Sequence, residues 1–329
     1  MRARTWQLLR LLADGKFHSG EEMGARLGVS RATVFNELEA VAVWGIALQR
    51  IRGRGYRLTR PWQVLDVGVV TAALGEAAGR FEIEVMQQAA SSNTELLRRA
   101  ALGAPSGTVL AVELQTAGRG RIGRAWHSGL GNALTFSLLW RFDCGLNALS
   151  GLSLAVGVAI IRALQRVGVA GAGLKWPNDI LCAEVKLGAG GKLGGVLIEA
   201  QGDMYGPSAV VIGIGLNCYL PPDIEQAISQ RAAAIDPLCA TMPERNILLA
   251  VLLQELAAVL DVFALSGFAA LRDEWERFHA LKDSAIRLQM PDGSTVNGIA
   301  RGVSDAGELR LETAQGVGLF NSGEVGVRQ

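Results

Sequence analysis

The chain has 329 residues with a formal net charge of +1, and half of its residues are hydrophobic. This apolar content excludes a disordered protein, and the length suits two or three domains. A net charge near zero excludes a global field that would recruit nucleic acid or a membrane surface. The charge is uneven, however, because residues 1–60 carry eleven Lys or Arg against five Asp or Glu, a local balance of +6. A small basic module attached to a larger body is therefore expected.

The cysteine pattern and the first apolar runs indicate the compartment. The four cysteines are far apart and include no C-x-x-C pair: Cys144, Cys182, Cys218 and Cys239. Four reduced thiols are expected, not a disulfide framework or a Cys-based metal site. Asp14 precedes any long apolar run, which argues against a signal peptide. The uncharged run 146–161 is too short to span a bilayer and predicts a buried helix. A cytoplasmic protein with no membrane partner is expected.

The first sixty residues show the spacing of three short helices. Apolar residues recur at helical intervals from Trp6 onward. Ser19 and Glu22 form a capping box for a second helix. Ser30 is placed to cap a third helix after a tight turn at 28–30. This arrangement is typical of a helix-turn-helix, whose second helix enters the major groove of DNA.

A β-wing is expected after the third helix, with basic residues around a glycine-containing turn that suits phosphates. The candidate DNA-contacting residues of the helix and the wing are Arg31, Thr33, Asn36, Arg52 and Arg54. The alternative is a winged helix kept as a structural or protein-binding appendage. Glu37 and Glu39 favour this alternative, because on the exposed side of the recognition helix they would repel phosphates.

The segment 118–128, GRGRIGRAWHS, combines glycines with arginines. Glycine lets backbone N–H groups approach a ligand, and arginine offers a planar fork of donors to phosphate or carboxylate. The segment spells G-x-G-x-x-G after an apolar run, but a dinucleotide fold needs a crossover helix at this point. The next strand-like run, 133–140, begins ten residues after Gly123, so that helix does not fit. An anion-binding loop is predicted, with a solvated basic loop as the alternative.

Three further stretches place polar residues beside strand-like runs. The stretch ASSNT at 90–94 either orients a polar ligand group or caps a helix. The stretch KWPND at 175–179 either positions a metal-bound phosphate or forms an Asx turn. The stretch 186–199 contains Lys-Leu-Gly twice, and its second copy runs directly into an apolar strand. From about residue 283, short alternating runs broken by turn residues predict a small all-β barrel.

The motifs GRGRIGRAWHS, KWPND, KLGGVLIE and GIGLN occur in this order and closely resemble those of the bifunctional biotin–protein ligases that also repress the biotin operon. The resemblance covers nearly the whole chain. It implies an α+β fold with three domains. These are a winged helix-turn-helix at 1–61, a mixed α/β ligase domain at 62–281 similar to class II aminoacyl-tRNA synthetases, and an SH3-like β-barrel at 282–329.

The resemblance also implies an activity. The family forms biotinyl-5′-AMP from biotin and ATP with Mg²⁺, then biotinylates one lysine of a biotin carboxyl carrier protein. Loop 118–123 would close over the adenylate and exclude water from its acyl phosphate. The implied catalytic residues are Lys192, Arg119 and Arg121. The implied biotin-binding residues are Ser91, Ser92, Asn93, Gln115, Gly118, Arg119, Gly120, Arg121 and Lys192. The implied ATP- or adenylate-binding residues are Gly118, Arg121, Trp126, Asn178, Asp179 (also as a Mg²⁺ ligand) and Asn217.

Operator DNA is an implied partner, as is a homodimer promoted by the adenylate and formed through an exposed edge of the central sheet. Two alternatives remain: a DNA-binding biotin sensor without ligase activity, and a lipoate ligase, against which the GRGRIGR loop and the winged helix argue. The sequence departs from the family pattern in three places. The segment 182–191 is longer than usual, so Lys186 competes with Lys192 as the site lysine. The recognition helix carries Phe-Asn-Glu at 35–37 where family repressors are often more basic, and the tail 327–329 is short.

Overall fold

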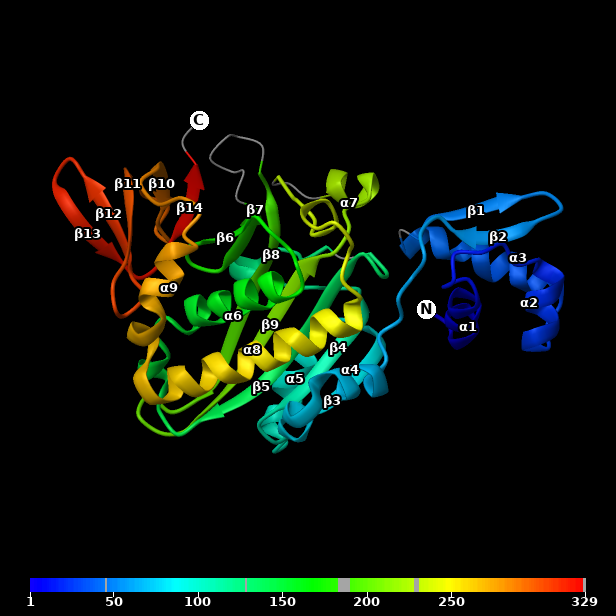
Figure 1. Cartoon of the computed structure of the whole chain (residues 1–329), viewed down its shortest axis with the longest axis horizontal. Helices are drawn as coiled ribbons and strands as arrows, with labels where there is room; N and C mark the ends of the chain where they lie inside the picture. Colours follow the sequence, from blue (N-terminus) through cyan, green and yellow to red (C-terminus); the bar gives the residue numbers. More distant parts are fainter. Residues whose placement is uncertain (45, 128, 183–189, 228–230, 328–329) are drawn as a thin grey trace.

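The structure, a computed structural model, describes residues 1–44, 46–127, 129–182, 190–227 and 231–327. A small N-terminal domain, a large sheet domain and a C-terminal β domain follow one another along the chain (Figure 1). Some features singled out in the sequence lie outside the described residues. They are Ser128 of the glycine–arginine segment, Lys186 with most of the long 182–191 segment, and the last two residues of the tail.

The N-terminal domain is a helix-turn-helix unit with a β-wing. Its elements are α1 (Ala3–Leu11), α2 (Gly20–Leu27), α3 (Arg31–Glu39), the 3₁₀ helix η1 (Ala40–Trp44), β1 (Leu48–Ile51) and β2 (Gly55–Leu58). Both predicted caps are confirmed. Ser19 Oγ accepts a hydrogen bond from the Glu22 N–H at 3.0 Å, and Ser30 Oγ accepts one from the Thr33 N–H at 3.1 Å. Gly28, with φ at 64°, makes the left-handed turn between α2 and α3.

Glu37 does not lie on the exposed side of α3, so the expectation that it opposes DNA is wrong. Its side chain is buried, and its carboxylate accepts a hydrogen bond from Thr5 Oγ1 at 2.5 Å and one from Arg2 at 3.3 Å. The hydrogen bond from Thr5 is the largest cause of a lowered pKa for this carboxyl. Glu37 therefore fixes α3 against α1. Glu39 is exposed and lies 3.9 Å from Arg50, so it is the carboxylate that remains on the open face.

The segment 62–66 fastens the N-terminal domain to the sheet domain. Trp62 packs against Trp6 of α1, with ring centroids 5.6 Å apart. On its other side, a Cβ at Gly131 would lie 2.6 Å from the Trp62 ring, so the indole also contacts the loop that enters β5. Asn246 donates to the carbonyl of Val64 and accepts from the N–H of Asp66. Packed residues, not a loose tether, join the two domains.

A buried ion pair lies beneath this junction. Arg245, at the start of α8 (Arg245–Ser266), donates to Glu113 Oε2 at 2.8 Å, and both side chains are only 2% exposed. The same guanidinium donates to the carbonyls of Gln63 and Ala133. The other carboxylate oxygen of Glu113 accepts from the N–H of Leu65 at 2.6 Å. One ion pair thus links the linker, the sheet and the longest helix.

A seven-stranded sheet of order β3-β4-β5-β9-β8-β7-β6 forms the central domain. Its strands are β3 (Glu82–Ala89), β4 (Thr108–Gln115), β5 (Ala133–Phe142), β6 (Ala172–Lys175), β7 (Asp179–Cys182), β8 (Lys192–Gly202) and β9 (Ser208–Asn217). β3 and β4 run parallel, and the other neighbours pair antiparallel. Because side chains alternate along a strand, Val109 and Ala111 of β4 face one core while Leu110 and Val112 face another.

Helices cover both faces of the sheet. The helical segments of this domain are α4 (Val67–Leu74), η2 (Gly75–Arg80), α5 (Ser92–Ala101), η3 (Arg121–Gly123), η4 (Leu146–Leu149), α6 (Leu152–Arg166), α7 (Pro222–Ala227), η6 (Asp236–Leu238), α8, η7 (Phe268–Leu271) and α9 (Arg272–Arg277). α6 and α8 lie side by side over one face (Figure 1), and α5 packs on the other. Two short helices, η7 and α9, follow one another directly between α8 and the C-terminal domain.

Among the described residues, α8 is one helix with the length and apolar composition of a membrane span. More than half of its most apolar window is buried inside the protein, where it packs on α6 and α4. Its mainly apolar sequence is explained by this position, since a helix enclosed by neighbours has little polar face to keep.

The C-terminal domain is the small β unit that the sequence predicts. Its strands are β10 (Ala285–Gln289), β11 (Thr295–Val303), β12 (Leu309–Thr313), β13 (Gly316–Phe320) and β14 (Glu324–Val327), paired antiparallel in the order β13-β12-β11-β10-β14. It docks on the central domain through main-chain carbonyls. Trp176 Nε1 donates to the carbonyl of Gly307 at 3.0 Å, and Ser150 Oγ donates to that of Ala306 at 2.6 Å.

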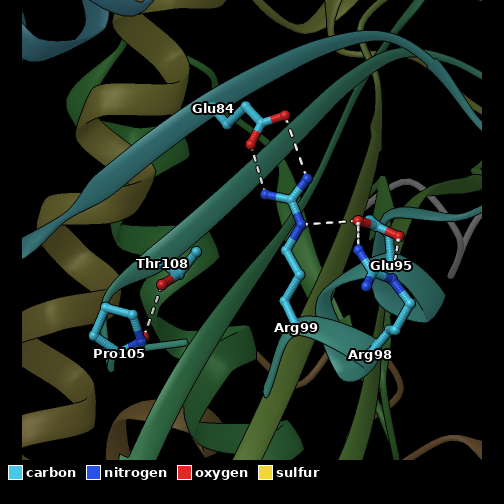
Figure 2. Close-up of polar contacts among 6 residues, drawn as sticks. All are labelled: Glu84, Glu95, Arg98, Arg99, Pro105 and Thr108. Atoms are coloured by element: carbon cyan, nitrogen blue, oxygen red, sulfur yellow. Dashed lines mark hydrogen bonds and ion pairs between the residues drawn. The ribbon is translucent and has the colours of Figure 1, made fainter. Parts of the chain in front are cut away.

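The two outer strands of the central sheet are protected in different ways. The edge of β6 is covered, because Leu174 donates to the carbonyl of Phe278 and accepts from the N–H of Ala280. The edge of β3 carries charge instead. Figure 2 shows Arg99 of α5 between Glu84 of β3 and Glu95. Its guanidinium donates to Glu84 Oε2 at 2.5 Å and to Glu95 Oε1 at 2.9 Å. Hydrogen bonds from Arg98 and Arg99 lower the pKa of Glu95 to about 2. Charged side chains on an edge strand oppose pairing with another chain.

Candidate functional site

A pocket opens on the sheet between the glycine–arginine loop and the C-terminal domain. It gathers residues from strands β4 to β9, from α5 and from β14. The predicted site residues that line it are Ser91, Ser92, Asn93, Gln115, Arg119, Gly120, Arg121, Trp126, Asn178, Asp179 and Lys192. Segments separated by more than a hundred residues are therefore brought to one cavity.

One end of the pocket is a cluster of buried neutral polar groups. Ser91 caps α5, which leaves Ser92 and Asn93 buried in its first turn. Gln115 Oε1 accepts from the N–H of Ser92 at 2.7 Å. The hydroxyl of Ser137 lies 2.7 Å from Ser92 Oγ and 2.6 Å from Asn93 Oδ1. Adjacent buried donors and acceptors suit a ligand group that needs both.

Arg119 lies at this polar end, beside a carboxylate. Its NH2 is 2.5 Å from Glu199 Oε2, and the same oxygen accepts from Asn93 Nδ2 at 2.9 Å. The sequence predicts Arg119 as a biotin-binding and catalytic residue, and the structure places it at this polar end, paired with Glu199. The guanidinium is nearly half exposed, so it can leave this partner without a large desolvation cost.

The other end holds two lysines on one carboxylate. Asp179 accepts from Lys192 at 2.7 Å through Oδ1 and from Lys175 at 2.8 Å through Oδ2. Burial raises the pKa of the Asp179 carboxyl, and the charges of Lys175 and Lys192 outweigh this effect, so its pKa lies below the usual value. Asp179 is therefore ionised, and the three groups together carry one positive charge.

Asp179 does not fit the role of Mg²⁺ ligand that the resemblance implies. Each of its oxygens already accepts from an ammonium group, and the described residues contain no group of three or more His, Cys, Asp or Glu that could hold a metal. A hard cation needs oxygen ligands that are free of such competition. The described residues thus provide no resident magnesium site at this position.

The glycine–arginine loop forms a hairpin over the pocket. The N–H of Trp126 donates to the carbonyl of Gly118 at 2.8 Å, and the N–H of Gly120 donates to that of Arg124 at 2.7 Å. A Cβ on Gly118 would lie 2.6 Å from the Trp126 carbonyl oxygen, so the close approach requires glycine. Arg124 forms an ion pair with Glu324 of β14. The loop is thereby tied to the C-terminal domain.

Two residues of the loop, Arg121 and Trp126, line the pocket. Arg121 donates to Asn178 Oδ1 at 3.1 Å, and burial lowers the pKa of its guanidinium. Trp126 packs so closely on β9 that a Cβ at Gly215 would lie 2.5 Å from its ring. Its buried Nε1 has no hydrogen-bond partner within the described part of the chain. A flat ring with a free donor suits a planar heterocycle.

Two predicted residues do not line the pocket. Gly118 acts through its backbone at the base of the hairpin. Asn217 is buried behind the wall, where its Nδ2 donates to the carbonyls of Lys192 and Ala233. Asn217 is thus placed to hold the strand start that carries Lys192, not to touch a nucleotide.

Some residues that line the pocket or bond to its lining residues were missed in the sequence. Lys175 and Glu199 are the first residue of KWPND and the last of KLGGVLIE, so their motifs already contained the signal. Ser137 lies within an apolar strand, and only alternation could have marked it. Glu324 and Val325 come from the C-terminal domain, and no local pattern ties that segment to the pocket.

The candidate DNA-contacting residues gather on one unit. Arg31 and Asn36 of α3 are exposed and Thr33 is half-buried, while Arg52 and Arg54 are exposed at the tip of the wing. Arg54 also stacks over Phe17 at 4.4 Å, which restrains its side chain. The basic tip and the recognition helix therefore belong to one domain, as predicted.

The class of protein is defined by three family matches in chain order. Residues 4–57 match a helix-turn-helix (HTH) domain, residues 85–217 match the biotin/lipoate A/B protein ligase family, and residues 283–328 match the biotin protein ligase C-terminal domain. The fold and the pocket described above thus correspond to a ligase domain between a DNA-binding type domain and a ligase-specific β domain.

Individual relatives identify the family within this class. The chain is 34% identical to the bifunctional ligase/repressor BirA of Salmonella typhimurium over 98% of this chain and 96% of that protein, and 33% identical to that of Escherichia coli over the same shares. It also resembles the solved biotin protein ligase from Aquifex aeolicus in complex with biotin and ATP, with 26% identity, a TM-score of 0.62, and coverage of 75% of this chain and 99% of that one. The chain belongs to the bifunctional ligase/repressor (BirA) family.

Proposed function

We propose that this protein is an ATP-dependent biotin–protein ligase. The observation that carries the proposal is a single pocket with a neutral polar end at Ser92 and Asn93 and a cationic end at Lys192. Biotin has a ureido ring, which needs donors and acceptors together, and a carboxylate at the opposite end. The pocket matches this polarity.

The proposed reaction has two steps. A carboxylate oxygen of biotin bonds to the α-phosphorus of ATP, and pyrophosphate leaves with the electron pair of the broken P–O bond. A neutral lysine amine of a biotin carboxyl carrier protein then attacks the acyl carbon and loses a proton, and AMP leaves with the electron pair of the broken C–O bond. Lys192 and Arg121 line the pocket and are proposed to stabilise the developing phosphate charge. Trp126 is proposed to pack on adenine. Mg²⁺ is proposed only as a counterion that travels with the triphosphate.

The test is direct. The protein is mixed with biotin, MgATP and a carrier domain, and the carrier is probed with streptavidin. Labelled carrier is expected. A protein that binds biotin but leaves an active carrier unlabelled would be the DNA-binding sensor, which the ligase names of the relatives do not support. Replacing biotin with lipoate tests the third reading, and no transfer is expected.

We further propose that the protein acts in the cytoplasm as a biotinyl-AMP-dependent repressor and binds operator DNA through α3 and the wing. Burial of Glu37 removes one of the two objections to this role. The domain boundaries 1–61, 62–281 and 282–329 remain part of this proposal, and they place all five candidate DNA contacts in the first domain.

Salt dependence should identify the phosphate contacts. Because each released counterion contributes to the slope of log affinity against log salt, Arg52→Ala should weaken binding to every sequence and lower the magnitude of that slope by about 1. Asn36→Ala should instead reduce discrimination between operator and random DNA. Gel-shift titrations at several salt concentrations measure both. An unchanged slope for Arg52→Ala would remove the wing tip from the interface.

The proposed homodimer is best supported at β8. Beyond Leu197 the described residues give β8 a partner on one side only, β9. The other two edges are less suitable, because β6 is covered and β3 carries the charges of Figure 2. Glu199, the partner of Arg119, lies on this free part of β8. A ligand that contacts Arg119 would therefore also change the contacts of Glu199 at this edge.

Sedimentation with a non-hydrolysable biotinyl-adenylate analogue tests this interface. The analogue should promote a dimer, and Ala200→Lys on the exposed part of β8 should prevent it without loss of ligation. Glu82→Lys on β3 is the matched control and should dimerise normally. If Glu82→Lys is the variant that stays monomeric, the interface lies at β3 instead.

A further inference from the structure

Lys175 is a pocket lysine to which the proposed function gives no role. It is half-buried, ends β6 and lines the pocket. Its ammonium lies 2.8 Å from Asp179 Oδ2 and 3.3 Å from the main-chain carbonyl oxygen of Val325 in the C-terminal domain. Two acceptors from two domains thus hold one cation at the pocket wall.

Lys175 determines the net charge of its group with Asp179 and Lys192. Asp179 cancels one of the two ammonium charges that it holds, so the Lys175–Asp179–Lys192 group is net positive only while both lysines are present. Without Lys175, the pair of Asp179 and Lys192 is neutral. Lys175 therefore supplies as much of the field at this end of the pocket as Lys192 does.

Position separates the two lysines. Lys192 is on β8, Asp179 on β7 and Lys175 on β6, and these strands are neighbours in the sheet. Both ammonium groups contact the single Asp179 carboxylate, Lys192 on one oxygen and Lys175 on the other. Lys175 comes from the strand further from Asn93, so a ligand with its head group at Asn93 and its carboxylate near Lys192 would meet Lys175 with the phosphates that follow.

We propose that Lys175 binds the leaving pyrophosphate of ATP during adenylation; this rests on the proposed function. When a biotin carboxylate oxygen bonds to the α-phosphorus, the bond to the α–β bridging oxygen breaks and its electron pair leaves with pyrophosphate. A fixed ammonium beside the departing phosphates stabilises the charge that gathers there. The C-terminal domain contributes by holding Lys175 through the carbonyl of Val325.

A substitution series separates charge from structure. Lys175→Met removes both charge and hydrogen bonds, Lys175→Gln keeps a donor for Val325, and Lys175→Arg keeps the charge. Lys282→Met is the control, since it removes a lysine that pairs with Glu276 outside the pocket. The probe is inorganic pyrophosphate, whose binding is measured by calorimetry and needs neither biotin nor carrier.

A charged hydrogen bond predicts a loss of about tenfold in pyrophosphate affinity, and in ATP KM, for Lys175→Met and Lys175→Gln. Lys175→Arg should keep most of the affinity and Lys282→Met all of it. Transfer from supplied biotinyl-AMP to the carrier should be unchanged, because pyrophosphate has already left.

Three results would overturn the assignment: no pyrophosphate binding by the unmodified protein, full affinity in Lys175→Gln, or an equal loss in the transfer step. The last two would make Lys175 a structural support. A protein whose pyrophosphate affinity depends on Lys175 but which labels no carrier would refute the ligase proposal and leave this site in place.

Discussion

Lys192→Ala should lower biotin-dependent ATP–pyrophosphate exchange by roughly 10²- to 10³-fold, the usual effect of removing one group that stabilises developing charge. Lys192 lies in the pocket 2.7 Å from Asp179, and its backbone is fixed by Asn217. Because Lys175 still pairs with Asp179 in this variant, no carboxylate is left unpaired. The loss should therefore be in chemistry, with near-normal stability.

Lys186→Ala is the matched control for Lys192→Ala. Lys186 belongs to the first Lys-Leu-Gly copy and lies outside the described residues, so the experiment decides between the two copies. Exchange should be close to that of the unmodified protein. A collapse in Lys186→Ala with normal exchange in Lys192→Ala would move the active lysine to the long segment.

Arg245→Met should reduce the free energy of unfolding by about 3–5 kcal/mol, because it leaves the Glu113 carboxylate buried without its cation. Both side chains are 2% exposed, and the guanidinium also donates to the carbonyls of Gln63 and Ala133. The lost contacts join the linker, the first residue of β5 and α8. Urea unfolding measures the change.

A surface ion pair between the same kinds of residues provides the comparison. Arg166 pairs with Glu255 at 2.6 Å across α6 and α8, and the Arg166 side chain is half exposed. Arg166→Met should cost less than about 1 kcal/mol. The double variant Glu113→Gln with Arg245→Met should recover part of the loss, since no buried charge remains. Equal effects of Arg245→Met and Arg166→Met would mean that the buried pair adds nothing beyond a surface contact.

The fold was predicted best where the signal is local in the sequence, as in helix caps and strand-like runs. Ser19 and Ser30 cap helices where the pattern places them, and the strand-like run at 133–140 is the core of β5. Glu37 shows the limit of such signals. Its position in the helix allowed an exposed side chain, and only the packing of α3 against Thr5 of α1 decided that it is buried. A contact between two helices cannot be derived from either helix alone.

The site was predictable where a motif carries its own chemistry, as with Lys192 and Trp126. It was not predictable where a partner comes from elsewhere in the chain. Arg119 pairs with Glu199, eighty residues away, and the sequence around neither residue indicates this pair. Asp179 was expected to bind metal, but the two lysines on neighbouring strands occupy it. Pairing partners depend on strand order, which the sequence did not specify.

The contribution of β14 to the pocket bears on the protein's synthesis. Lys175 and Arg124 both meet partners in Glu324 and Val325, which leave the ribosome last among the pocket residues. During translation, the N-terminal helices and most of the sheet emerge while this wall of the pocket is absent. A nascent chain therefore has the lysines but neither the carbonyl that holds Lys175 nor the tie on the loop. Activity should begin only when β14 has docked, so that a chain truncated before residue 324 forms no protected adenylate.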